Sequence, residues 1–238
     1  VTNVAICEMI ERKTKKGLAD DLIYPDKAVL IPELVKTLPY KFFATSSIDA
    51  LIHSIESFVS PNATYYSRIF SKEAMTIILG CYKKVVSGEN WNKYAKDFLY
   101  ASDLAGIAFN NAGCGAVHAL SYPLGGTYHI PHGEANMLMF EAVFKKYREK
   151  DPSGKINDLY FVLSNVLCCD KEDALDEMFK LLDLILKRNP LNTYGVKKEE
   201  LLEFAKSVIQ NQGRLLANNY TSLSEDEMLE IYESVFDK

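Results

Sequence analysis

From Pro39 to the C-terminus the chain is a nearly continuous series of helical patterns, and this feature constrains its fold more than any other. Apolar residues recur at spacings of three and four, and Gly and Pro residues separate the segments. The expected helices cover residues 46–59, 65–86, 91–110, a segment through 118, 131–148, 156–167, 172–187, 198–210 and 224–236. No fixed-period repeat occurs. The pattern predicts a mainly all-α fold of about eight or nine helices.

Residues 1–38 differ in character from the rest of the chain. Residues 4–10 and 27–31 have the composition of short strands, and residues 14–17 are typical of a turn. Two isolated strands do not form a stable sheet. The chain also starts without methionine. We therefore expect residues 1–38 to be the end of a sheet-containing domain that continues upstream, and residues 39–238 to be a separate helical domain.

Charge and cysteine content exclude several classes of protein. The net charge is −5, and the sequence contains no basic block interleaved with aromatic residues. Binding to a nucleic acid or to an anionic membrane is therefore not predicted. No apolar run has the length of a bilayer span, and no signal peptide opens the chain. The five cysteines include no Cys-x-x-Cys pair, which indicates reduced thiols. These features predict a cytoplasmic protein.

The sparse histidines point to a metal site. Asp49 and His53 are four residues apart, so both lie on one face of their helix. His118 lies in an apolar, glycine-rich segment, and His132 follows Pro131 at the expected start of another helix. We expect the stretch between them, with Pro123 and two adjacent glycines, to break the helix. Such a break would let two distant histidines face one space.

Each of these residues also has an ordinary structural explanation. Asp49 and His53 could simply bond each other, His118 could be a core histidine, and His132 could bond a backbone group. Together, however, one aspartate and three histidines suit iron(II) or zinc. His129 precedes Pro131, so we expect it in a loop with at most a pocket role. The motifs of zinc proteases, di-iron bundles, serine hydrolases and nucleotide-binding loops are absent.

These residues belong to a longer resemblance. The run Ile48-Asp-Ala-Leu-Ile-His53-Ser-Ile-Glu-Ser-Phe-Val-Ser60 is similar to the first metal-binding helix of the iron-containing (group III) alcohol dehydrogenases. Residues 104–111, His118-Ala-Leu, residues 123–126 and residues 130–136 resemble the signature segment of that family. Residues 22–39 and 225–232 extend the match over nearly the whole chain. The resemblance implies a helical metal-binding domain of the dehydroquinate-synthase-like type.

The resemblance also implies roles for single residues. Asp49, His53, His118 and His132 would be the metal ligands, with no further catalytic residue identified. Phe109 matches a position that lines the substrate pocket. Tyr122 stands in the same pocket where many relatives have a second histidine, so a proton relay there is in doubt. The cofactor-binding residues belong to an upstream α/β domain, of which residues 1–38 would be the tail.

The function implied is that of an alcohol dehydrogenase or aldehyde reductase that uses a divalent metal, iron before zinc, and NAD or NADP. The nearest resemblance is to members that interconvert 4-hydroxybutyrate and succinate semialdehyde. Arg214 is one candidate for binding a substrate carboxylate. The family also implies a homo-oligomer, and the chain is not expected to be active without the cofactor domain. A metal-dependent hydrolase or lyase, and a helical interaction domain with a structural metal, stay open as alternatives.

Overall fold

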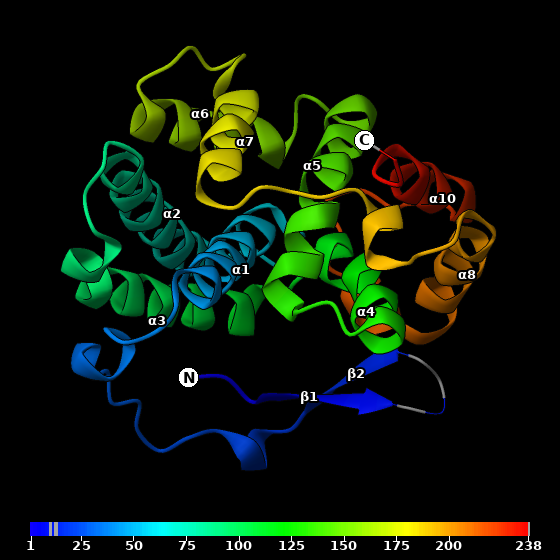
Figure 1. The fold of residues 1–238 in the computed structure, drawn as a ribbon, viewed down its shortest axis with the longest axis horizontal. Coiled ribbons are helices and arrows are strands. Elements are labelled where there is room, and N and C mark those ends of the chain that lie inside the picture. Colours follow the sequence, from blue (N-terminus) through cyan, green and yellow to red (C-terminus); the bar gives the residue numbers. More distant parts are fainter. Residues whose placement is uncertain (10, 12–13, 238) are drawn as a thin grey trace.

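The chain forms two layers, a large helical body and, beneath it, a two-stranded hairpin with the segment that follows (Figure 1). The structure, a computed structural model, describes residues 1–9, 11 and 14–237. The strands are β1 (Val4–Met9) and β2 (Thr14–Ala19). The α-helices are α1 (Tyr40–Val59), α2 (Tyr65–Val86), α3 (Ala95–Ala112), α4 (Ala116–Tyr128), α5 (His132–Lys150), α6 (Lys155–Leu167), α7 (Ala174–Ile185), α8 (Leu201–Asn211), α9 (Gly213–Leu216) and α10 (Glu225–Ser234). The expected mainly all-α fold is confirmed.

Short 3-10 helices complete the described secondary structure. They are η2 (Asp21–Ile23), η3 (Pro32–Val35), η4 (Trp91–Tyr94), η5 (Leu191–Tyr194) and η6 (Lys198–Glu200). The ten α-helices in the described part exceed the eight or nine expected, because the single pattern drawn over residues 198–210 is followed by the separate four-residue helix α9. None of the helices in that part is both long and apolar enough to cross a membrane.

The first forty residues depart most from the sequence-based expectation. The strand predicted from residue 4 is correct as far as Met9, and Ile10 lies outside the described residues. The predicted turn at 14–17 is wrong, because those residues belong to β2, which pairs antiparallel with β1. The strand predicted at 27–31 is also wrong. Those residues have no described strand beside them to supply hydrogen bonds, and Val29 is 75% exposed.

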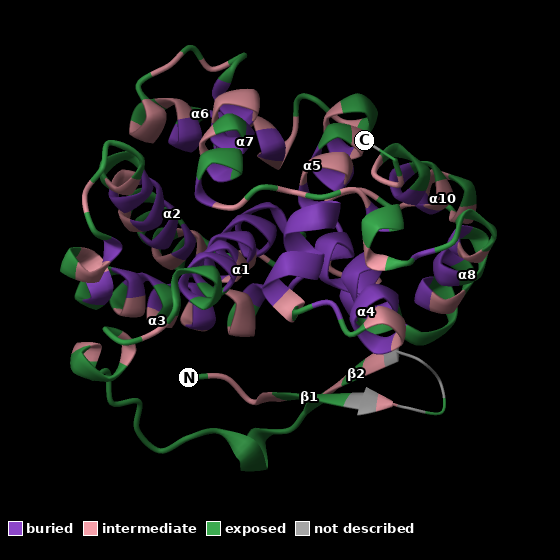
Figure 2. Ribbon diagram, viewed as in Figure 1, coloured by how far each residue is buried: buried purple, intermediate pink, exposed green. Residues whose placement is uncertain are grey.

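Helix α1 is the centre of the helical body. It packs against α2, α3 and α5, and most of its surface is buried (Figure 2). Its serines are accommodated because their hydroxyls donate to backbone carbonyls one turn back, as Ser47 does to Phe43 at 2.8 Å. The helix starts at Tyr40 rather than at the predicted Ser46, since Phe43 and Ala44 continue the buried face.

Helix α4 corrects the expectation of a break at Pro123. The helix continues from Ala116 through the proline and both glycines to Tyr128. A proline removes one helical hydrogen bond and crowds the preceding carbonyls. Here the residues around it are buried, and the Tyr232 hydroxyl donates to the Leu120 carbonyl at 2.6 Å. The bond that Pro123 cannot make is the one to the Ala119 carbonyl, and burial of the segment offsets its loss. The chain therefore turns only after Tyr128, where His129 has a φ of 53°.

Candidate metal centre

The structure brings the four predicted ligands together. Asp49 and His53 come from α1, His118 from the first turn of α4 and His132 from the first position of α5. One nitrogen or oxygen from each lies within 4.8 Å of the others. Oδ1 of Asp49 is 3.6 Å from Nε2 of His118 and 3.7 Å from Nε2 of His132. Three segments far apart in the chain therefore converge on one space.

The position of His132 depends on a close contact between α5 and α1. Gly133 lies against the Thr45 carbonyl, and a Cβ at this glycine would overlap the carbonyl oxygen. Pro131 immediately precedes the helix, where its extended backbone starts the turn. Glycine thus allows the start of α5 to approach α1 closely enough for His132 to face Asp49.

Aromatic rings surround the cluster. Phe109 from α3 stacks on His53 with ring centroids 4.4 Å apart, and His53 stacks on His118 at 4.6 Å. Tyr122 is buried, and its ring centroid is 6.1 Å from that of His132. Both predicted pocket residues therefore adjoin the cluster. His129 is exposed at the end of α4 and is not one of its members.

Two polar side chains that the sequence analysis did not single out also belong to the site. Glu56 contacts His118, with Oε2 2.6 Å from Nδ1. Asn136 donates from Nδ2 to Oδ1 of Asp49 at 2.6 Å, and the same nitrogen is 3.2 Å from Nε2 of His132. A signal existed in the sequence: Glu56 is one turn from His53 on a buried apolar helix, where a carboxylate needs a partner.

Burial and neighbouring charges shift the pKa values of the cluster. Burial alone would raise the pKa of Asp49, but His53, His118 and His132 outweigh it and lower that pKa far below its usual range. Burial is the main reason why the pKa values of His53 and His132 fall to about 4. Both imidazoles are therefore neutral beside an ionised carboxylate, and all three groups offer lone pairs.

His118 differs from the other two histidines. Burial would lower its pKa, but Cys114, Asp49 and Glu56 raise it well above the usual value. Cys114, Asp49 and Glu56 therefore favour a positive charge on or beside the His118 ring. Nε2 of His118 is buried and has no hydrogen-bond partner among the described residues. An unpaired buried nitrogen is costly unless a ligand completes it. One carboxylate with three imidazoles fits iron(II) or zinc, so the residues present suit a divalent metal.

A cavity of about 410 Å³ lies in front of the cluster. Asp49, His53 and His132 line it together with the hydroxyl residues Ser46 and Ser102. The side chain of His132 is 32% exposed, whereas that of His118 is only 4% exposed. The cluster is thus closed on the α4 side and open toward the cavity, as a site needs to be if a small molecule is to approach it.

A larger hollow of about 600 Å³ lies beside α5, away from the histidines. Four of its charged residues pair with one another, since Arg188 pairs with Glu141 and Asp183, and Lys145 also pairs with Glu141. Lys187 lines it as well, but the described residues that line the hollow include no histidine or cysteine that could bind a metal. The smaller cavity is the better candidate, because Asp49, His53 and His132 of the cluster line it.

Comparisons with known proteins find similar sequences and structures over nearly the whole chain. The sequence profile of the Fe-containing alcohol dehydrogenase family, C-terminal, matches residues 43–236. The 4-hydroxybutyrate dehydrogenase of Clostridium kluyveri is 52% identical over 240 residues, which cover 99% of this chain and 64% of that protein. The chain thus spans less than two thirds of the length of this curated relative.

Solved structures show the same fold. A 1,3-propanediol oxidoreductase superposes with a TM-score of 0.85 at 27% identity, covering 99% of this chain and 62% of the other. The sulfoacetaldehyde reductase of Bifidobacterium kashiwanohense, solved in complex with NAD+, gives a TM-score of 0.82 at 24% identity, with 99% and 61% covered. The hairpin and the helical body are therefore a recurring arrangement.

Proposed function

Because the chain belongs to the iron-containing alcohol dehydrogenase family, we propose that it is the metal-binding part of a nicotinamide-dependent alcohol dehydrogenase. The convergence of Asp49, His53, His118 and His132 beside a cavity that three of them line carries the proposal. The names of the relatives given above are those of dehydrogenases, oxidoreductases or reductases of alcohols and aldehydes. These names favour hydride transfer over the hydrolase, lyase or interaction-domain alternatives.

The four residues would hold a divalent metal, with iron(II) preferred over zinc as the assignment. NAD or NADP would be the second cofactor. When bound, these cofactors supply a Lewis acid for the substrate oxygen and a hydride carrier. The chain itself contributes the walls of the site. Phe109 and Tyr122 would limit the space beside the cluster and exclude water from it, while Ser46 and Ser102 offer hydroxyls to a polar ligand in the cavity.

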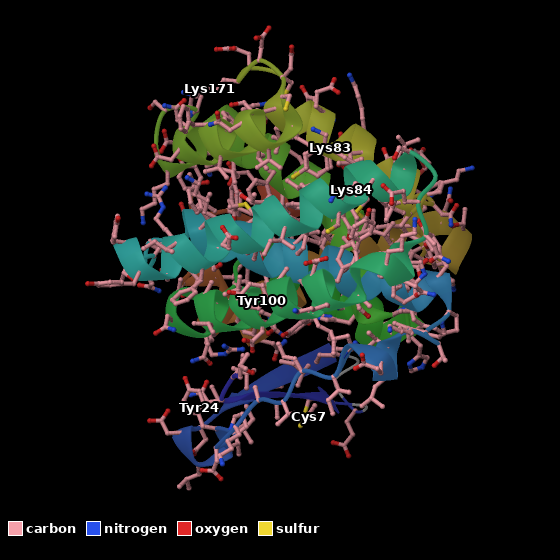
Figure 3. All side chains as sticks on the ribbon, turned by 90° about the vertical axis from the view of Figure 1, so that its left-hand side faces the viewer. Cys7, Tyr24, Lys83, Lys84, Tyr100 and Lys171 are labelled. Atoms are coloured by element: carbon pink, nitrogen blue, oxygen red, sulfur yellow. The ribbon has the colours of Figure 1, made fainter. Side chains whose placement is uncertain are left out.

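The cofactor would be held mainly by polypeptide outside these 238 residues, with residues 1–38 as the tail of that domain and residues 39–238 as the catalytic domain. The segment after the hairpin supports this assignment, because it presents large apolar side chains to solvent. Leu22 is 92% exposed and Leu34 is 73% exposed. Figure 3 shows this layer, with Tyr24 and Cys7, below the helical body. Such a surface is suited to burial against further protein.

Two broader assignments belong to the same proposal. The five cysteines are free thiols, which fits a reducing compartment such as the cytoplasm. A homo-oligomer is proposed from family membership. Light scattering on the complete protein would test it, and a monomeric mass at micromolar concentration would contradict it.

For the substrate we propose 4-hydroxybutyrate and succinate semialdehyde, since the clostridial relative bears that name. An unpaired cation beside the cluster supports a carboxylate-bearing substrate. Lys15 on β2 lies against α4, and its Nζ would be 2.8 Å from a Cβ added at Gly125. Its charge acts on His132, and it has no ion-pair partner among the described residues. Arg214, the candidate taken from the sequence, is exposed and lies against Gly17, farther along β2.

A pair of adjacent lysines tests the substrate assignment in the complete protein. Successive side chains of a strand point to opposite faces, so Lys16 is a matched control for Lys15. We expect Lys15→Met to lower kcat/KM for 4-hydroxybutyrate about tenfold or more, the loss expected for one charged hydrogen bond. The same variant should leave kcat/KM for 1-butanol little changed. Lys16→Met should change kcat/KM for neither substrate. Equal losses on both alcohols would contradict a carboxylate-binding role.

Removing single histidines tests the metal assignment. We expect His118→Ala and His132→Ala to lose the metal and the activity of the complete protein, because each removes one of four ligands. His129→Ala is the matched control, as this histidine is exposed outside the cluster. Elemental analysis after gel filtration gives the metal content. Full metal content and normal turnover in both cluster variants would refute the proposal.

A further inference from the structure

The buried carboxylate of Glu56 makes two bonds to consecutive residues of α4. Its Oε1 accepts from the Val117 backbone N–H at 2.8 Å, and its Oε2 lies 2.6 Å from Nδ1 of His118. Glu56 itself is 3% exposed and comes from α1, more than sixty positions earlier in the chain. One side chain thus fixes both the backbone and the ring at the start of α4.

The bond to Nδ1 decides what the other ring nitrogen can do. An ionised carboxylate can only accept, so Nδ1 must carry the proton in this contact. Nε2 of His118 is the nitrogen directed toward Asp49, and it is buried with no hydrogen-bond partner in the described part of the chain. With one proton held on Nδ1, Nε2 is the ring nitrogen that can bind a metal, which would take the place of any second proton there. Carboxylates that orient metal-binding histidines in this way raise metal affinity.

The bond to Val117 N–H holds the ring in place through the backbone. Val117 is the second residue of α4, and the first N–H groups of a helix lack partners within it. A negative charge there is favoured by the helix dipole. Gly115 leaves room for the carboxylate, because a Cβ on it would lie 3.3 Å from Oε1 of Glu56. The ring of His118 therefore cannot shift unless α4 shifts with it.

We propose that Glu56 is a positioning residue for the metal centre: it holds His118 with the proton on Nδ1, so that Nε2 faces the space shared with Asp49 and His132. This rests on the metal-binding role proposed above. A carboxylate is required, because two donors must be accepted at once. A glutamine in its place has one acceptor oxygen, so either Val117 N–H or His118 Nδ1 meets an amide N–H group instead.

A rival explanation is that Glu56 binds a metal directly. Glu56, Cys114 and His118 offer a buried set of donor atoms within 4.8 Å of one another. If a metal occupied that set, Cys114 would be needed as much as Glu56. The variant Cys114→Ser therefore separates the two roles: its hydroxyl keeps a hydrogen-bonding group beside His118, but it removes the sulfur that a metal would bind.

The experiment measures Zn²⁺ binding by the 238-residue chain, using competition with a chromophoric chelator, and urea unfolding with and without Zn²⁺. We expect Glu56→Gln to weaken Zn²⁺ binding ten- to a hundredfold. Each tenfold loss removes about 1.4 kcal/mol of the stabilisation that saturating Zn²⁺ adds. Glu56→Asp, which keeps both acceptor oxygens on a shorter side chain, should recover part of the affinity. Cys114→Ser and Glu141→Gln should bind Zn²⁺ as the wild type does.

Each other outcome overturns the proposal. If Glu56→Gln is less stable than the wild type both with and without Zn²⁺ but binds Zn²⁺ with normal affinity, it has lost only a structural bond. Equal weakening in Cys114→Ser makes Glu56 a direct ligand. If Glu56→Gln does not fold, Gly115→Ala takes its place, because it keeps the carboxylate but crowds it. Normal Zn²⁺ affinity in that folded variant refutes the positioning role. Retention of Zn²⁺ by His118→Ala would instead refute the metal-binding function itself.

Discussion

Single atoms decide whether this metal centre can assemble. His132 reaches Asp49 only because Gly133 has no side chain where α5 passes the Thr45 carbonyl. On the other side of the cluster, Asn136 bonds Asp49, and Glu56 bonds His118. Asp49, His118 and His132 are thus positioned by contacts with residues that are not members of the cluster.

Gly133 provides a direct test of that close approach. We expect Gly133→Ala to destabilise the chain by about 1–3 kcal/mol, the usual cost of overpacking, and to weaken metal binding because His132 is displaced. Gly80 is the matched control, since a Cβ there meets nothing within 4 Å in the middle of α2. Gly80→Ala should instead stabilise by about 0.5–1 kcal/mol. Urea denaturation measures both effects. An equally stable Gly133→Ala chain would contradict the observed packing.

Among the helices, α5 links the metal centre to the outer part of the body. It starts at His132 against α1, and farther along it Glu141 pairs with Arg188, which follows α7. Lys145 pairs with the same carboxylate from one turn away. Burial would raise the pKa of Glu141, but Lys145 and Arg188 outweigh it and lower that pKa.

This shift predicts how stability depends on pH. A carboxyl group whose pKa is lowered by folding contributes stability above its unfolded pKa and loses it as the pH falls through its folded pKa. Glu141→Gln should therefore be less stable than the wild type at neutral pH, by about 1 kcal/mol or less for a partly exposed pair. The difference should vanish in acid. Glu149→Gln, whose native side chain is 64% exposed on the same helix, should show little change. A pH-independent difference for Glu141→Gln would contradict the ion pair as its cause.

In the molecule as a whole, the site lies where the two layers meet. The helices supply the metal cluster, and β2 lies against α4 with Lys15 near His132 (Figure 1). The cavity opens from the α1 and α5 side of the cluster. The cluster residues thus come from the helical layer, whereas Lys15 comes from the hairpin layer.

Local sequence was sufficient for much of this protein. Helical periodicity depends on neighbours three and four residues apart, so α2 could be predicted over its full length. Asp49 and His53 could be paired because one helical turn separates them. The few histidines of the chain then linked them to His118 and His132 as one candidate metal site. The family resemblance implied the same four ligands, and the structure brings all four together.

Contacts between distant segments required the folded chain. No local pattern joins Glu56 to His118 or places Lys15 beside α4, because those distances depend on how whole helices pack. The same holds for α4 continuing through Pro123, where burial of the segment outweighs a local preference for a break. It also holds for β2, whose residues resemble a turn until β1 supplies their hydrogen bonds. Short-range energies select the helices, whereas long-range packing and hydrogen bonds complete the site.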